Sequence, residues 1–351
     1  MGCMFVIYPS NSRFRWVECQ LETLRKCKTV AHVRKTLKSL PKNLDATYVR
    51  ILQGIDEYYC SKVRDIFALL AFSGRIVTLG EIVEFVAFNE TTKSFNEEEK
   101  FLDPYFVLEV CSSLVTLLDH QTEYQRQSNE NNAKPTVEDM DIKVMRKELR
   151  FAHYSVKEFL VAPRNSTNQF YISESFAHAL IAERCVRYLL SHLSVPTELT
   201  HESLIRYPFL EYAAVNWYTY AVSVKANNAR LNDLMMQFFD NVSNCCLQNW
   251  LKVWHPDCPW EGVLPQRQER DPLPIYFSSL TGLVNVTNEL VAKGADVNAQ
   301  GGYFGNALQA ASNMATKQQS DYCWRQAATS TLRVDSMVMR CRQLRAMATK
   351  R

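Results

Sequence analysis

The sequence predicts a mainly α-helical protein with one small β-hairpin. Apolar residues recur three and four positions apart through most of the 351 residues, which is the period of a helix that buries one face. Two short segments with strand character, 114–118 and 148–153, flank a polar stretch. Near the C-terminus, Pro274 and Ala307 begin similar segments 33 residues apart. A chain of this length has room for two or three domains.

Residues 1–60 predict two or three helices of a bundle. Pro41 separates the second helix from the third, because proline disfavours a helical residue before it. We expect the apolar stripes of these helices to be core. The stripes are Phe14, Val17, Leu21 and Leu24; Val30, Val33 and Leu37; and Leu44, Tyr48, Ile51, Leu52 and Ile55.

Residues 61–162 begin with three predicted helices. The first ends near Gly74. Thr78 and Glu81 have the spacing of a capping box, in which each side chain bonds the backbone N–H of the other, and they would begin the second helix. A third helical pattern covers about residues 104–111.

A β-hairpin follows these helices. Segments 114–118 and 148–153 are predicted strands, and the polar, aperiodic stretch 119–147 between them is a predicted loop. Three helices followed by such a hairpin describe a winged helix, with the hairpin and its long loop as the wing. The sequence therefore predicts a winged-helix domain over residues 61–162.

Residues 163–254 carry aromatic residues at helical spacing and predict a further helical domain. The next stretch, 255–273, contains four prolines and several charges and predicts a linker.

Residues 274–312 predict a remnant of an ankyrin-repeat array, one full and one partial, because that repeat has a period of 33 residues. In the full unit, Gly294 closes the second helix, and Asp296 and Asn298 belong to the turn into the next unit. The second unit begins at Ala307 but then lacks the expected glycines and leucines. Residues 313–351 are predicted to be a divergent, disordered tail with basic character.

Composition favours a cytoplasmic protein. The formal net charge is only +3, which gives no general electrostatic reason to expect nucleic acid or an anionic membrane as a partner. The longest apolar runs, such as 66–72, are too short to span a bilayer. Eleven scattered cysteines indicate free thiols in a reducing compartment. We expect protein partners, with no nucleic acid and no membrane.

Motifs of the common enzyme classes are missing. The sequence has no phosphate-binding loop, dinucleotide fingerprint, nucleophile elbow or zinc-binding helix motif. One candidate metal cluster, Cys245, Cys246, His255 and Cys258, matches no common zinc spacing. We therefore expect no metal and no cofactor.

His153 and Ser155 could be drawn as a catalytic base and nucleophile, with Glu158 nearby. In a strand the two residues share a face, but proton transfer would need further partners. We expect no catalytic residue, and the more ordinary role for His153 is a structural one.

DNA binding is a less favoured hypothesis. A winged helix reads DNA through a basic recognition helix. The candidate helix, 79–90, carries three Glu and no Lys or Arg. Its charge would repel the phosphate backbone.

In their order along the chain, these segments resemble the part of fungal NACHT-type signal-transducing ATPases that follows the nucleotide-binding domain. Those proteins are STAND-type relatives of the animal NOD-like receptors and commonly end in ankyrin repeats. Their winged helix is of the type also named for GPI inositol-deacylases. The resemblance covers about residues 13–312 and is carried by FRWVECQLETLRKC (14–27), LKSLPKNLDATYVRILQGID (37–56), FALLAFSGRIVTLGEIVEFVAF (67–88), CSSLV (111–115), ELRFAHYSVKEFLV (148–161), FLEYAAVNW (209–217) and GADVNAQGGYFGNALQAAS (294–312).

The resemblance implies a cytosolic switch. In this family the winged helix holds the inactive state, and the histidine of a Phe-x-His-x-Ser motif lies near the nucleotide phosphates. Here the motif is Phe151, His153 and Ser155, supported by Glu158. His153 would then sense nucleotide if a NACHT domain were supplied, and the ankyrin repeats would offer a concave surface to protein partners.

The nucleotide-binding domain of the family is absent from this sequence. We therefore expect a truncated, non-catalytic regulatory or protein-interaction module that could act on a NACHT domain in trans. The alternative is the C-terminal half of a complete nucleotide-dependent ATPase switch, divided by a gene model. In both cases the helices of residues 14–58 should expose apolar surface that the missing domain would cover.

Overall fold

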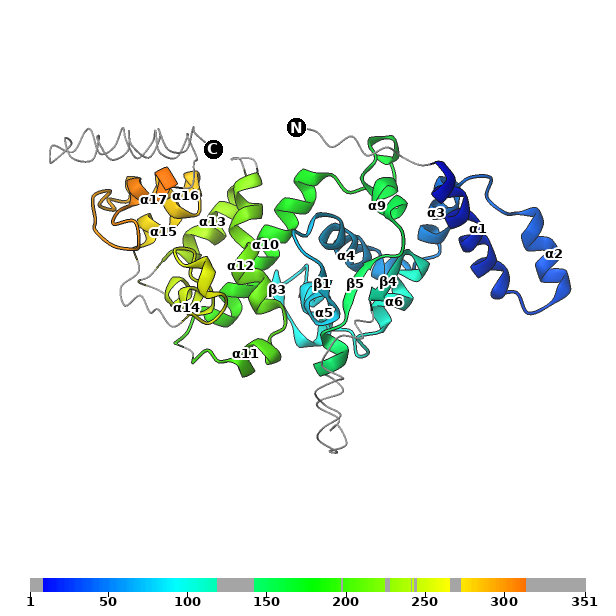
Figure 1. The fold of residues 1–351 in the computed structure, drawn as a ribbon, viewed down its shortest axis with the longest axis horizontal. Coiled ribbons are helices and arrows are strands. Elements are labelled where there is room, and N and C mark those ends of the chain that lie inside the picture. Colours follow the sequence, from blue (N-terminus) through cyan, green and yellow to red (C-terminus); the bar gives the residue numbers. More distant parts are fainter. Residues whose placement is uncertain are drawn as a thin grey trace, which may run out of the picture. The chain divides into compact units, whose positions relative to one another are not determined.

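The computed structural model describes residues 9–118, 142–196, 198–224, 228–240, 242, 245–265 and 273–313 (Figure 1). This part of the chain is mainly α-helical with small antiparallel sheets, so the predicted fold class is confirmed at that level. The chain divides into two compact units. Unit 1 lies within residues 1–86 and 100–177, and unit 2 lies within 87–99 and 178–351. The predicted tail 313–351 falls outside the described residues except for Asn313.

Three helices open unit 1, as predicted for residues 1–60. They are α1 (Pro9–Arg25), α2 (Val30–Lys38) and α3 (Leu44–Gln53). Side-chain caps fix where two of them begin: Thr29 accepts from the His32 amide at 3.2 Å, and Asn43 accepts from the Ala46 amide at 2.8 Å. Each cap satisfies a backbone donor that the first turn of a helix leaves unpaired.

The first apolar stripe is not core. Phe14, Val17 and Leu21 are 76%, 45% and 50% exposed, whereas α1 buries the neighbouring face with Arg15 and Cys19. The prediction of a buried stripe is wrong because periodicity shows that a helix has an apolar face but not what covers it. The expectation that residues 14–58 expose apolar surface is confirmed.

The rest of unit 1 surrounds a three-stranded antiparallel sheet of order β1-β5-β4. The predicted pairing of 114–118 with 148–153 is confirmed, since Val115 lies opposite Phe151. Strand β1, which extends the sheet, was not predicted because it is only two residues long. The strands are β1 (Val77–Thr78), β4 (Val115–Leu118) and β5 (Glu148–Phe151), and the helices are α4 (Cys60–Phe72), α5 (Leu79–Val86), α6 (Phe106–Val110) and α9 (Tyr154–Val161).

Helix α5 begins at the predicted capping box. The Thr78 amide donates to Glu81 Oε2 at 2.8 Å, and the Glu81 amide donates to Thr78 Oγ1 at 3.3 Å. The helix ends at Val86, so the predicted helix over 79–90 is too long: Phe88 already belongs to a strand. Every residue of α5 is buried, which leaves it unable to enter a DNA groove.

The loop predicted at 119–147 lies outside the described residues up to position 141. Residues 142–145 are helical, and the Lys147 carbonyl accepts from the Leu79 amide at 2.7 Å. The end of the predicted loop is therefore held against the start of α5.

Unit 2 contains a short hairpin and a set of helices around an aromatic core. Trp217 and Trp250 are fully buried with ring centroids 5.7 Å apart, and Trp250 Nε1 donates to the Ala214 carbonyl at 2.8 Å. The described residues of the range 163–254 are mainly helical, as the sequence predicts. The elements are β2 (Phe88–Asn89), β3 (Ser94–Phe95), α10 (Glu174–Leu193), α11 (His201–Arg206), α12 (Phe209–Ser223), α13 (Ala229–Phe238) and α14 (Cys246–Val253).

The C-terminal part of unit 2 has three short helices, α15 (Pro274–Leu280), α16 (Val284–Ala292) and α17 (Ala307–Asn313). Helices α15 and α17 begin at the two positions that the sequence sets 33 residues apart, and they pack against each other. Gly294 follows α16 with φ +93°, a conformation that side chains disfavour.

The structure differs from the linker predicted at 255–273. His255, Asp257 and Cys258 are buried, and Trp254 forms a β-bridge with Val263. The prolines and charges of this stretch predicted exposure, which these buried residues contradict. Residues 266–272 lie outside the described part.

The two units also follow limits other than the predicted domains 1–60, 61–162 and 163–254. Residues 87–99, the β2–β3 hairpin, lie inside the predicted winged-helix range but belong to unit 2. No helix in the described ranges is both long and apolar enough to cross a membrane.

Candidate functional site around His153

His153 caps a helix. It follows β5 with an extended backbone and is the N-cap of α9, so the predicted strand 148–153 ends two residues early, at Phe151. Its Nδ1 accepts from the Ser155 amide at 3.2 Å and lies 2.6 Å from Ser155 Oγ. Imidazole thus replaces the Ser, Thr, Asp or Asn that usually begins a helix.

A buried hydrogen-bond chain extends from this cap to α3. Tyr48 Oη and Ser155 Oγ are 2.8 Å apart, and both side chains are buried. The backbone amide of Ser155 can only donate, so Nδ1 of His153 carries no proton and the neutral ring holds its proton on Nε2. The Ser155 hydroxyl then donates to Nδ1 and accepts from Tyr48.

The surroundings of this hydrogen-bond chain favour a neutral His153 imidazole. Burial lowers the pKa of His153, and the Arg15 guanidinium lowers it further, against the opposing effect of Glu18 and Glu158. Arg15 is itself buried and donates to Glu18 Oε2 and to the Ser113 carbonyl, each at 2.7 Å. Burial raises the pKa of Tyr48, which keeps its hydroxyl protonated.

The other motif residues support the cap. Phe151 packs against Phe67 with ring centroids 5.9 Å apart. Glu158 is exposed on α9 and influences His153 through its charge. The structure therefore brings His153 and Ser155 into contact, whereas Phe151 packs on Phe67.

The sequence indicated that proton transfer between His153 and Ser155 would need further partners. They do touch, but the Ser155 hydroxyl is buried and is shared between Tyr48 and His153. A nucleophile must reach its substrate, and this one is enclosed. The geometry suits a cap better than an acyl-transfer pair.

Sequence reasoning missed Tyr48 and Arg15. Tyr48 was placed in an apolar stripe, yet a buried tyrosine usually finds a partner for its hydroxyl, and that was the available signal. Arg15 gave no such signal in the sequence, because it lies next to the apolar face of α1.

The His153 cap predicts a pH dependence of stability. A lowered pKa means that the unfolded chain binds a proton below pH 6.5 while the folded chain does not, so the free energy of unfolding should fall as the pH drops through 6.5. The fall should end once the folded imidazole is also protonated. His153→Asn keeps a capping oxygen without titrating. Urea unfolding of both proteins on either side of pH 6.5 should show the wild type losing more stability, and an equal loss would contradict this account.

The candidate metal cluster is not assembled. Within the described ranges, no group of three or more His, Cys, Asp or Glu could hold a metal ion. Burial, and to a smaller extent the neighbouring Cys245, raises the pKa of the Cys246 thiol to about 12. The Cys246 Sγ lies 3.9 Å from the Leu189 carbonyl. Metals bind the thiolate, so this protonated thiol is structural.

The predicted turn residues form the turn after α16. The Asn298 amide donates to Asp296 Oδ1 at 2.9 Å, and Gly294 supplies the left-handed residue before them. Further along, Asp257 ties the loop to α15: it accepts from Tyr276 Oη at 2.6 Å and from the Tyr303 amide at 2.8 Å. The side chains of Asp296 and Asp257 thus fix the conformation of these two loops.

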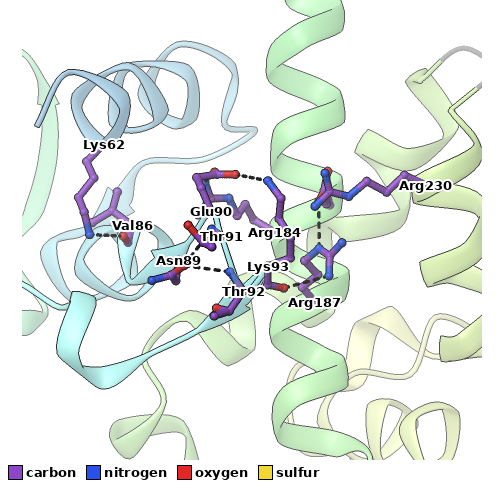
Figure 2. A network of polar contacts seen from close by, with 11 residues as sticks. Lys62, Val86, Asn89, Glu90, Thr91, Thr92, Lys93, Arg184, Arg187 and Arg230 are labelled. Atoms are coloured by element: carbon purple, nitrogen blue, oxygen red, sulfur yellow. Dashed lines mark hydrogen bonds and ion pairs between the residues drawn. The ribbon is translucent and has the colours of Figure 1, made fainter. Parts of the chain in front are cut away.

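A second polar network in unit 2 joins the β2–β3 hairpin to α10 (Figure 2). Arg184 donates to Glu90 Oε1 at 2.6 Å, and its guanidinium lies 3.8 Å from the centre of the Phe88 ring. Arg187 donates to the Lys93 carbonyl at 3.0 Å. Arg184 is paired with a carboxylate and Arg187 donates to a backbone carbonyl, so this network connects the hairpin to α10 and is not an anion-binding site.

Arg184→Met should loosen this hairpin. The change removes a charge-assisted hydrogen bond and a cation–π contact, together about 2 kcal/mol. Hydrogen exchange of the Asn96 amide, which bonds the Ala87 carbonyl at 2.9 Å, should accelerate about thirtyfold. Arg230→Met is the matched control, because Arg230 forms its ion pair with Glu183 of α10 and acts on Glu90 of the hairpin through its charge alone. Equal effects of the two changes would contradict this connection.

No family model matches the chain, and no solved structure gives a significant match. A protein of Monascus ruber described as "Azaphilone pigments biosynthesis cluster protein L" is 30% identical over 294 residues. The alignment covers 79% of this chain and 58% of that protein, so the chain spans less than two thirds of its relative's length.

Proposed function

We propose that the chain is a non-catalytic regulatory and protein-interaction module of the NACHT-ankyrin type. In this proposal, helices α4 to α6 and the sheet β1-β5-β4 are a winged helix, and α15 to α17 are one full and one partial ankyrin repeat. Two features support it: the antiparallel pairing of β4 with β5 after three helices, and the start of α15 and α17 at equivalent repeat positions.

The observation that carries the proposal is the orientation of His153. Its Nδ1 is used by the α9 cap, so its Nε2–H is left as a donor on a partly exposed ring. The neutral Nε2–H donor, held in place by the buried hydrogen bonds of Ser155 and Tyr48, suits the recognition of a phosphate oxygen presented by another domain. The Tyr48 bond links that donor to α3, so the helices of residues 1–60 would respond to its engagement.

The experiment supplies a NACHT domain as a second protein. A separately expressed NACHT domain loaded with a fluorescent ADP analogue is mixed with the full chain, and the release of the analogue is followed. Wild-type chain should slow the release, and His153→Ala should remove about ten- to a hundredfold of that effect, which is the range for one hydrogen bond to a charged group. Glu158→Gln is the control, since it retains the cap and the donor. No slowing by the wild type would contradict the proposal.

A second candidate is the C-terminal half of a complete ATPase switch. It is favoured by the exposed stripe Phe14, Val17 and Leu21, which an additional domain of the same chain could cover. Sequencing of transcripts upstream of the Met1 codon tests it: an in-frame phosphate-loop motif would support this candidate, and its absence would favour the module acting in trans.

The name of the Monascus ruber relative refers to a pigment biosynthesis cluster. This name supports a biosynthetic gene cluster as the setting of the module. It gives no reaction, and we propose no catalytic role on its basis.

A further inference from the structure

A strongly basic surface lies on α2, the two turns beside it and the end of α1 in unit 1. Residues 23–43 contain seven Lys and Arg and no Asp or Glu. All seven side chains are exposed. We call them the α2 basic surface: Arg25, Lys26, Lys28, Arg34, Lys35, Lys38 and Lys42.

The charges of this surface are not neutralised by the protein. Within the described ranges, none of the seven forms an ion pair, whereas other basic residues of unit 1, such as Arg75 and Lys100, pair with Glu81 and Glu84. The net charge of +3 for the whole chain therefore conceals a local excess of +7. Such an excess attracts an anionic partner.

The same surface carries exposed apolar side chains. Val30 and Leu37 are 68% and 50% exposed and lie seven residues apart, on one face of α2. Thr36, on another side of the helix, is the buried residue of α2, with its Oγ1 3.3 Å from Cys27 Sγ. Figure 1 places α2 at the margin of unit 1. The exposed face is thus apolar along its centre and cationic beside it.

This combination decides between possible partners. Nucleic acid offers phosphates but no apolar layer for Val30 and Leu37. A helical partner would meet the nine residues of α2, roughly 13 Å, but the basic residues extend into both flanking turns. An anionic lipid surface is continuous, with phosphate and carboxylate headgroups above an acyl layer. Basic residues beside an amphipathic helix suit such a surface.

We propose that the α2 basic surface binds anionic phospholipids at a membrane surface, with Val30 and Leu37 among the uppermost acyl carbons. The seven Lys and Arg lie at the headgroups, and their aliphatic stems reach past the apolar side chains. This site is independent of the His153 proposal. It also differs from the expectation of no membrane, which came from the net charge and ignored its distribution.

Vesicle sedimentation of the full chain tests the proposal. Vesicles of phosphatidylcholine with phosphatidylserine should bind the chain, and vesicles of phosphatidylcholine alone should not. Raised salt should weaken the binding, because exposed charges are screened. The triple change Arg34→Glu, Lys35→Glu and Lys38→Glu should reduce the partition coefficient by about a hundredfold or more.

Two variants make the test specific. Val30→Ser with Leu37→Ser keeps the charge and should weaken binding about tenfold. Lys143→Glu, Arg146→Glu and Arg150→Glu change the same number of exposed charges elsewhere in unit 1 and should leave most of the binding intact. Equal losses in the two charge variants would overturn the proposal. So would a lack of vesicle binding, or DNA binding tighter than vesicle binding and unaffected by the serine changes.

Discussion

Replacing Trp250 with alanine should destabilise unit 2 by about 3–5 kcal/mol, the largest effect that we expect from one substitution. Trp250 is fully buried, its ring lies against Trp217 and Phe238, and its Nε1 bonds the Ala214 carbonyl. Alanine would leave a cavity at the centre of the aromatic core and would remove the hydrogen bond between Trp250 Nε1 and the Ala214 carbonyl of α12. The slowest-exchanging amides of α12 and α14 report this free energy directly.

The exposed Trp260 provides the control for Trp250. It is 68% exposed, so Trp260→Ala removes the same side chain without a cavity and should cost less than about 0.5 kcal/mol. Similar losses from both changes would show that the aromatic cluster does not hold unit 2 together.

Asp257→Ala should cost about 3 kcal/mol in the C-terminal part of unit 2. The carboxylate is buried and receives hydrogen bonds from Tyr276 Oη and the Tyr303 amide, and Tyr276 Oη accepts in turn from the Phe304 amide. Alanine leaves two donors without an acceptor where water has little access. Hydrogen exchange at Tyr303 and Phe304 should accelerate by about a hundredfold.

Asp257→Asn separates the loss of the acceptor from the loss of charge. The amide oxygen can still accept one of the two bonds, so about 1 kcal/mol should be lost. If Asp257→Ala were as mild as a surface change, residues 255–265 would behave as the linker predicted from the sequence and not as the packed loop of the structure.

The sequence predicts local elements of this protein well because their causes are local. Thr78 and Glu81 begin α5 through bonds to each other's backbone, and the 33-residue spacing places the starts of α15 and α17. The strands β4 and β5 are marked by their alternation on either side of a polar loop.

What the sequence could not predict depends on distant partners. The stripe of Phe14 and Leu21 has the period of a core face but is exposed, because nothing in the described part of unit 1 covers it. The sequence places Asp257 in a linker, and only the structure shows its hydrogen bonds to Tyr276 and Tyr303.

The candidate site shows the same division. The motif located His153 and Ser155, but their roles depend on Tyr48, which is more than a hundred residues away and holds the Ser155 hydroxyl. Such a bond leaves no periodic trace in the sequence. The tautomer of His153 determines which ring nitrogen can donate a hydrogen bond. It can be inferred only from the α9 cap, which the structure shows.

The central proposal is that this chain is a non-catalytic module with a phosphate-directed donor and that it does not bind nucleotide by itself. Equilibrium titration of the purified full chain with a fluorescent ADP analogue tests it most directly, with His153→Ala alongside. We predict no saturable binding by either protein. Saturable binding by the wild type that His153→Ala abolishes would contradict the account, because the chain would then contain a complete nucleotide site.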